Sequence, residues 1–278
     1  MQVDRTIGFI GAGNMAEALL RGVFAAGVLR PAQCTVTNKN NDERLARLAR
    51  AWAVRTTRDK ALLMAESEVV ILAVKPHDMP AVLSEIAPYT TARHLIVSVA
   101  AGVPCEAIEG CLGAAPVVRA MPNTSTAVRA SATAIASGRL AGPDHLAIVR
   151  TLFEAVGWVG VVPESMLDVV TAVSGSGPAY IYVLAEALVD SGEQAGLPRD
   201  LARALVAQTI LGAGKMLTET GEAPERLRER VTSPGGTTMA GLEALEQGGL
   251  RAAVRAAVTR AARRARELRS APARTPAS

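Results

Sequence analysis

The chain has 278 residues, of which 49% are hydrophobic and only 3% aromatic. This length is enough for one large domain or two medium ones, each with a core built from aliphatic side chains. The net charge of +4 comes mainly from arginines that stand beside Asp and Glu in helical stretches. Such a pattern indicates solvated helix faces and argues against nucleic-acid binding.

Three features predict a soluble protein of the cytoplasm. Cys34, Cys105 and Cys111 are odd in number, without C-x-x-C spacing or a nearby histidine cluster, which argues against disulfides and a metal site. The chain runs from its N-terminus directly into a strand, so we expect no leader. No apolar run reaches the roughly 18 residues of a membrane span, so we expect no membrane contact.

The first half alternates strand-like with helix-like stretches. The predicted strands are Thr6–Ile10, Cys34–Thr37, Val69–Val74, Leu95–Val99, Pro116–Arg119 and Thr133–Ala136. Helical patterns cover Asn14–Ala26, which Gly27 ends, and Asp42–Ala51. This βαβ alternation predicts an α/β fold with a doubly wound, mainly parallel sheet of the Rossmann type.

The alternation of strand and helix patterns ends near Val162–Leu167, and no strand pattern follows. The predicted helices are Pro178–Ala195, Pro198–Thr220, Pro224–Val231, Thr237–Gln247 and Leu250–Leu268. The segment Pro178–Asp190 carries only Glu186 and Asp190 as charges, so we expect it to be buried in an intertwined homodimer. We therefore expect a Rossmann domain over residues 1–163, an all-α dimerisation and substrate domain over 164–270, and a disordered tail over 271–278.

A glycine motif marks the dinucleotide site. Gly11–Ala16 fits G-x-G-x-x-A directly after a strand and at the start of a helix. Glycines there allow a tight turn and a close approach of the backbone to a pyrophosphate, which lies on the helix N-terminus. The residues expected to bind the cofactor here are Ile10, Gly11, Ala12, Gly13, Asn14 and Met15. The alternative is a purely structural glycine turn.

The end of the second strand favours NADPH over NADH. NAD enzymes usually carry an acid at this point, which would repel a 2′-phosphate, but this chain has Asn38 and Lys39. Lys39 could instead be a solvated loop residue. Further residues expected at the carboxyl ends of the strands are Ala73, Val74, Lys75, Pro76, Val99, Ala101 and Asn123, the last assigned to substrate.

Two unusual strings lie in the helical half, at Val173–Tyr180 and Val231–Thr238. The second supplies glycines, hydroxyl groups and unpaired amides where the dipole of the helix at Thr237–Gln247 is positive. This arrangement suits a carboxylate without a charged side chain. The alternative is an ordinary helix cap.

The chain resembles the pyrroline-5-carboxylate reductase family over nearly its whole length. The resemblance is carried by four strings in order: Phe9–Met15, Ala73–His77, Ser174–Tyr180 and the most diagnostic, Thr232–Thr238, with Gly212–Met216 between the last two. It implies a reductase that turns 1-pyrroline-5-carboxylate into L-proline with NADPH, and a homodimer that can assemble into a decamer as a pentamer of dimers.

The resemblance also implies roles for individual residues. The hydroxyl of Thr238 is expected to bond the ring nitrogen, and the backbone of Gly236 and Thr237 to hold the carboxylate, with Ser233 and Gly235 in the same loop. The chain departs from some relatives at Ala223, where they carry a histidine, and at Arg230, where they carry an amide.

The histidines His77, His94 and His145 all lie in the first half. A carbonyl reductase usually needs such an acid, whereas an imine can enter as an iminium and needs none. The rivals are a 3-hydroxy-acid dehydrogenase, which would carry a lysine on the helix Pro178–Ala195, and a nucleotide-sensing or nucleic-acid-binding scaffold using the arginines of Arg251–Arg269.

Overall fold

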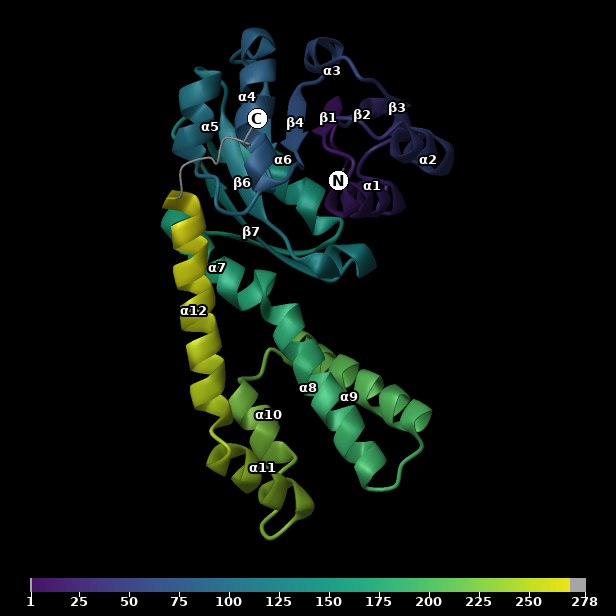
Figure 1. Ribbon diagram of the computed structural model, residues 1–278, viewed down its shortest axis with the longest axis vertical. Helices are drawn as coiled ribbons and strands as arrows, with labels where there is room; N and C mark the ends of the chain where they lie inside the picture. Colours follow the sequence, from purple (N-terminus) through teal and green to yellow (C-terminus); the bar gives the residue numbers. More distant parts are fainter. Residues whose placement is uncertain (1, 271–278) are drawn as a thin grey trace, which may run out of the picture. The chain divides into compact units, whose positions relative to one another are not determined.

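The computed structural model describes residues 2–270 and divides into two compact units (Figure 1). The first unit runs through Ser176 and resumes at Arg260, and the second is Gly177–Thr259. By packing, the division therefore falls thirteen residues after the expected boundary at 163/164, because Leu167 is buried against the last strands of the first unit. The expected tail over 271–278 lies outside the described residues.

The first unit is built on one twisted sheet. Within residues 2–270 its strands are β1 (Ile7–Ile10), β2 (Cys34–Thr37), β3 (Arg55–Thr56), β4 (Val69–Leu72), β5 (Leu95–Ser98), β6 (Val117–Met121), β7 (Ser131–Ser137) and β8 (Gly157–Val161). Their order is β3-β2-β1-β4-β5-β6-β7-β8, and only the β6–β7 pair is antiparallel. The predicted Rossmann-type sheet is thus confirmed, although the sequence did not indicate β3 or the glycine-containing β8.

Helices cover both faces of this sheet (Figure 1). They are α1 (Asn14–Ala25), α2 (Asp42–Trp52), α3 (Lys60–Glu66), α4 (Met79–Ile86), α5 (Cys105–Leu112), α6 (Pro143–Glu154) and α7 (Leu167–Val170). Strand β4 shows why: Val69 and Ile71 point into the core with α1, α2 and α6, while Val70 and Leu72 point into the core with α3, α4 and α5. A strand buried on both faces reads as a continuous apolar run.

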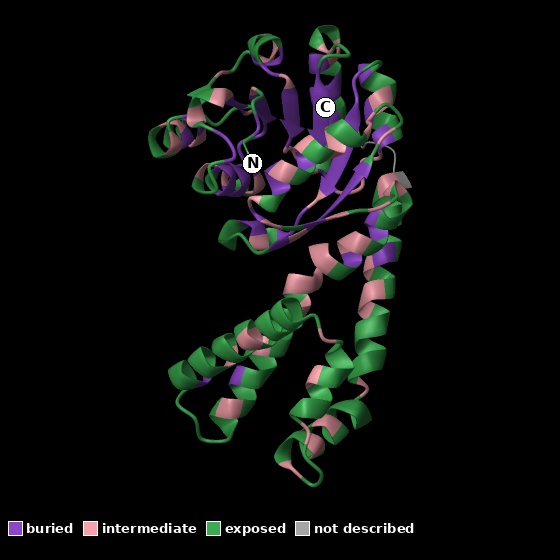
Figure 2. Ribbon diagram, turned by 180° about the vertical axis from the view of Figure 1, so that it is seen from behind, coloured by how far each residue is buried: buried purple, intermediate pink, exposed green. Residues whose placement is uncertain are grey.

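The second unit is helical and buries little by itself. Its helices are α8 (Gly177–Gln194), α9 (Arg199–Thr220), α10 (Pro224–Arg230), α11 (Thr237–Gln247) and the first part of α12 (Leu250–Ser270). Within Gly177–Thr259 the buried hydrophobic residues are Val189 and Ala202 alone. Figure 2 shows the surfaces of α8 and α9 as mostly exposed. A single copy of this unit therefore leaves most of its apolar side chains in water.

One helical run, Glu164–Gln194, is long and apolar enough to cross a membrane by length and composition, with a mean hydropathy of 1.2. The expectation that no stretch reaches this length was therefore wrong. The acidic and small residues near its start broke the apolar run in the sequence, but the helix continues through a π-helical turn at Thr171–Gly175. A core helix of a soluble protein passes the same test.

An ion pair between a buried arginine and a partly buried glutamate fastens the start of this run to the sheet. Arg119 of β6 is 3% exposed, and its guanidinium lies 2.8 Å from the carboxylate of Glu164, which also accepts from the amide of Cys105 at 2.7 Å. Burial by itself raises the pKa of Glu164, but the bonds from Arg119 and Cys105 outweigh it and hold that pKa below its ordinary value of 4.5.

Glu164→Ala should lower the free energy of unfolding by about 3 kcal/mol at pH 7, because it leaves Arg119 buried without a partner. A carboxyl group with a lowered pKa stabilises the fold above its unfolded-state pKa and loses that contribution as the pH falls. The difference between the two proteins should therefore shrink below about pH 4.5, a value set by the ordinary pKa of Glu164. Urea titrations at several pH values measure both effects.

Glu154→Ala is the matched control, because Glu154 pairs with Arg150 on the surface of α6 and both side chains are about half exposed. We expect it to cost less than about 0.5 kcal/mol. Equal losses in the two variants would contradict the role assigned to the buried pair.

Candidate functional site

The glycine loop after β1 is shaped for a close approach. Gly11 has a φ of +109°, and a Cβ atom there would lie 2.4 Å from the carbonyl oxygen of Ala73. Its amide donates to the carbonyl of Thr37 at 2.9 Å, which ties the end of β1 to that of β2. By contrast, a Cβ on Gly13 would meet no atom within 4 Å. The space above Gly13, at the N-terminus of α1, is therefore open for a pyrophosphate.

Arg44 of α2 holds this loop in place. Its guanidinium donates to the carbonyl of Ala12 at 2.7 Å and to the side chain of Asn14 at 3.3 Å, and it pairs with Glu17 at 2.7 Å. A hydrogen bond from Arg47, together with the nearby arginine charges, holds the pKa of Glu17 below its ordinary value. The sequence did not single out Arg44, because its contact with the loop depends on how α1 and α2 pack.

The loop after β2 carries the residues expected to select the cofactor. The side chain of Asn38 is engaged within the loop, since it donates to the carbonyl of Asn41 at 2.7 Å and accepts from the amide of Asn41 at 3.0 Å. Lys39 is 81% exposed and lies 3.8 Å from the carboxylate of Asp78. Arg58, which the sequence did not indicate, donates to the backbone carbonyls of Asn38 and Lys39. The loop is thus held by Arg58, while the ammonium group of Lys39 is exposed to solvent next to Asp78.

The expected strand ends come together at one edge of the sheet. The amide of Ala73 donates to the carbonyl of Ile10 at 2.8 Å, and the amide of Val99 donates to the carbonyl of Leu72 at 3.1 Å. The side chain of Lys75 is exposed and forms no ion pair within residues 2–270. Of the residues expected to bind the cofactor, those at this edge are Ile10, Gly11, Ala12, Gly13, Asn14, Met15, Asn38, Lys39, Ala73, Val74, Lys75, Pro76, Val99 and Ala101.

A cavity of about 70 Å³ opens at the same edge. It is lined by Ile10, Gly11, Asn38, Lys39, Lys60, Val74, Asp78, Ala81, Val82 and Glu85. Apolar side chains and glycine backbone form its walls, while two lysines and two carboxylates supply its charges. In a sheet of this strand order, the adenosine end of a dinucleotide lies beyond β1 and β2. The residues that line this cavity therefore fit part of the adenosine end of a dinucleotide.

Asn123 follows β6 and is buried. Its side-chain amide donates to the carbonyl of Ser174 at 3.0 Å, and its side-chain oxygen accepts from the amide of Ser125 at 3.1 Å. Both ends of the side chain are thus occupied within the first unit. We expected Asn123 to contact the substrate; in the structure its amide joins the end of β6 to the π-helical turn at Thr171–Gly175. Such turns are frequent at functional sites.

The diagnostic loop before α11 forms a tight turn. The amide of Gly236 donates to the carbonyl of Ser233 at 3.0 Å, with Pro234 second and Gly235 third in the turn. Gly235 has a φ of +70°, the left-handed conformation that a type II turn requires at its third residue. The amide of Gly236, which we expected to help hold a carboxylate, therefore already has a partner inside the turn.

The amides of Thr237 and Thr238 follow at the start of α11. In the described part of the chain they have no backbone acceptor, as is usual for the first turn of a helix. The hydroxyl of Thr238 is exposed and does not cap α11, whose first turn has no side-chain cap. Two free amides and a free hydroxyl therefore share the positive end of this helix.

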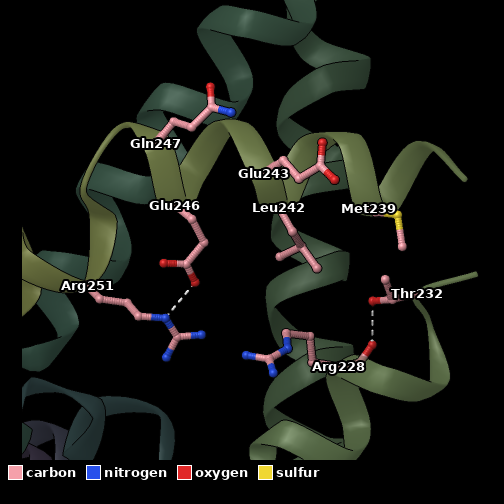
Figure 3. Close-up of a pocket in the computed structure, with 8 residues that line it drawn as sticks. All are labelled: Arg228, Thr232, Met239, Leu242, Glu243, Glu246, Gln247 and Arg251. Carbon is pink, nitrogen blue, oxygen red and sulfur yellow. Dashed lines mark hydrogen bonds and ion pairs between the residues drawn. The ribbon is translucent and has the colours of Figure 1, made fainter. Parts of the chain in front are cut away.

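A separate hollow of about 440 Å³ lies beside this loop (Figure 3). It is lined by Arg228, Thr232, Met239, Leu242, Glu243, Glu246, Gln247 and Arg251. Two of its polar groups already have partners: Thr232 donates to the carbonyl of Arg228 at 2.7 Å, and Arg251 pairs with Glu246 at 2.5 Å. None of the expected substrate residues lines it, so we assign it no substrate.

The histidines lie in the first unit. His77 is 76% exposed. His94 is fully buried, and its Nε2 lies 3.0 Å from the carbonyl of Met64, at the C-terminal end of α3. His145 accepts from the amide of Gly142 at the start of α6. The second unit contains no histidine, and α8 contains no lysine. The loop at α11 therefore brings no imidazole of its own.

Two glycine substitutions separate the roles of Gly13 and Gly11. Gly13→Ala should change the free energy of unfolding by less than about 1 kcal/mol, because its φ of −74° suits alanine and nothing lies in the way. It should weaken dinucleotide binding about ten-fold or more, because the methyl group occupies the pyrophosphate space. Gly11→Ala should lose both stability and binding. Calorimetry and thermal unfolding measure these effects, and unchanged binding in Gly13→Ala would contradict the assignment.

Comparisons with known proteins agree with this architecture. Residues 164–268 match the family described as pyrroline-5-carboxylate reductase dimerisation, and residues 6–102 match that described as NADP oxidoreductase, coenzyme F420-dependent. The chain is 44% identical to the pyrroline-5-carboxylate reductase of Arabidopsis thaliana over 263 residues. This alignment covers 94% of this chain and 95% of the relative.

Two solved structures extend the comparison. The pyrroline-5-carboxylate reductase of Coxiella burnetii has a TM-score of 0.91 at 40% identity, over 97% of this chain and all of that one. The pyrroline carboxylate reductase of Plasmodium falciparum, solved with NADP bound, has a TM-score of 0.85 at 28% identity, over 97% of this chain and 100% of its own. The chain belongs to the pyrroline-5-carboxylate reductase family.

Proposed function

We propose that this chain reduces the imine of L-1-pyrroline-5-carboxylate to L-proline with a hydride from NADPH, the last step of proline biosynthesis. The observation that carries the proposal is the start of α11, where free amides and a free hydroxyl meet without a charged side chain. The names of relatives support it: the Arabidopsis protein is a pyrroline-5-carboxylate reductase, and the Plasmodium structure holds NADP. We assign dinucleotide binding to residues 1–163 and substrate binding with dimerisation to residues 164–270.

The substrate offers a carboxylate and a ring nitrogen. The amides of Thr237 and Thr238 would hold the carboxylate at the positive end of α11, while Ser233 and Gly235 shape the loop around it. The hydroxyl of Thr238 would bond the ring nitrogen. When bound, NADPH supplies the hydride that adds to the imine carbon. Because the protonated imine becomes a neutral amine, the protein needs to supply no proton at that step.

A direct assay tests this activity. Absorbance at the reduced-nicotinamide band should fall when enzyme, NADPH and pyrroline-5-carboxylate are mixed, with a lower KM for NADPH than for NADH. It should not rise with 3-hydroxy acids and oxidised cofactor, because those dehydrogenases place a lysine on the long helix and α8 has none. Turnover of the hydroxy acids without turnover of the imine would overturn the proposal.

Thr238→Ala should lower turnover because one hydrogen bond to the nitrogen is lost, worth about 0.5–1.5 kcal/mol net. That corresponds to a loss of about two-fold to ten-fold, and more in a dry site. Thr238→Val, nearly the same shape as threonine, should lose a comparable amount, while NADPH affinity stays unchanged in both variants. Turnover and melting temperature are measured on the same preparations. A destabilised variant with full turnover would mean that Thr238 only supports the helix.

The second unit supports a homodimer, which we propose assembles further as a pentamer of dimers in the cytoplasm. The family match over residues 164–268 is to a dimerisation domain. Helix α8 leaves Tyr182 59% and Val183 64% exposed. A hollow of about 480 Å³ between α9 and α10 is lined largely by apolar residues, among them Met216, Leu217 and Leu227. A second subunit would cover these surfaces.

Sedimentation at micromolar concentration should therefore show no monomer. Val183→Glu should shift the protein towards smaller species, because it places a charge on the exposed apolar face of α8. Val128→Glu is the control, since Val128 is 75% exposed on the first unit. A single species of 28.9 kDa in the unmodified protein would refute the assembly.

A further inference from the structure

Two lysines face the small cavity at the end of β2, and they differ in their surroundings. Lys39 is 81% exposed and lies 3.8 Å from Asp78. Lys60, the first residue of α3, is 20% exposed, and its ammonium group lies 2.5 Å from the carboxylate of Glu85 on α4. Both side chains line the cavity together with Asn38. The residues of the loop after β2 therefore include only one of the two lysines that line the cavity, Lys39.

The more buried of the two ammonium groups, that of Lys60, should distinguish more strongly between a phosphate and a hydroxyl group on the cofactor. Solvent and salt screen the charge of Lys39, so its contact with an anion gains little. Water screens the ammonium group of Lys60 less, and a hydrogen bond from such a group to a phosphate is among the stronger ones in proteins. Burial thus favours Lys60 as the group that distinguishes a phosphate from a free hydroxyl.

The charges in the cavity balance until an anion arrives. Lys39 and Lys60 oppose Asp78 and Glu85, so two ammonium groups face two carboxylates. A phosphate monoester brings nearly two negative charges and three acceptor oxygens at neutral pH. It can replace Glu85 as the partner of Lys60, while Glu85, which is 55% exposed, turns to water.

We propose that Lys60 is a specificity-determining residue for the 2′-phosphate of NADPH, with Glu85 holding its ammonium group until the cofactor binds. The proposal rests on the proposed function in its choice of NADPH. Arg58 acts differently: it donates to the carbonyls of the loop and pairs with Asp42 at 2.6 Å, so it positions the loop and remains engaged there.

Calorimetry with two cofactor fragments tests the proposal without turnover. Adenosine 2′,5′-bisphosphate carries the 2′-phosphate, and 5′-AMP lacks it. Lys60→Gln should weaken binding of the bisphosphate about ten-fold or more while changing that of 5′-AMP less than two-fold, as expected for one lost charge-assisted bond. Lys39→Gln should have a smaller effect. Arg55→Gln removes the same charge from a surface pair with Glu66 that does not line the cavity, and it should have none.

Glu85→Gln removes the competing carboxylate and should tighten binding of the bisphosphate two-fold or more, again without effect on 5′-AMP. If Lys60→Gln behaves like Arg55→Gln, or if it weakens both fragments equally, the proposal is overturned. Weaker bisphosphate binding in Glu85→Gln would also overturn it, because the pair would then only shape the cavity. If the unmodified protein prefers the bisphosphate but leaves pyrroline-5-carboxylate unreduced, the proposed function fails and this inference stands.

Discussion

The dinucleotide site depends on the close approach of Gly11 to the carbonyl of Ala73. Any side chain at Gly11 would collide with that carbonyl, and the φ of +109° is one that other residues rarely adopt. This contact brings the end of β1 against that of β4, and the bond from Gly11 to Thr37 adds the end of β2. The open space above Gly13 and the small cavity beside Lys39 and Lys60 both follow from that convergence.

Much of the fold could be predicted from the sequence because its signals are local. The strand Cys34–Thr37 and the helix Thr237–Gln247 have the predicted bounds, since turn residues, glycines and prolines mark their ends. Strand β3 was missed because its two exposed residues show no hydrophobic pattern. Strand β8 was missed because it contains two glycines, and glycine is a poor strand former. The π-helical turn at Thr171–Gly175 has no sequence signature of its own.

In the candidate site, too, the local motifs could be predicted from the sequence and the contacts between elements could not. The glycine loop and the diagnostic loop are motifs that a reader of the sequence can find. Arg44, Arg58 and Lys60 act across elements, so only the packing of α2 and α3 against neighbouring loops and helices identifies them. The hydrogen bond from the amide of Gly236 to Ser233 could not be predicted for a related reason: it depends on the conformation of the turn.

The second unit combines an unburied helical surface with a loop that offers only dipoles and hydroxyls. Both features suit an oligomeric imine reductase, in which a partner covers the apolar helices and the substrate brings its own proton. The proposed reaction transfers a hydride from the nicotinamide to the imine carbon. NADPH carrying deuterium at the transferred position of nicotinamide C4 should place one deuterium at C5 of proline, as measured by mass spectrometry and NMR. Deuterium at that carbon from heavy water, or none from the labelled cofactor, would rule out direct hydride transfer.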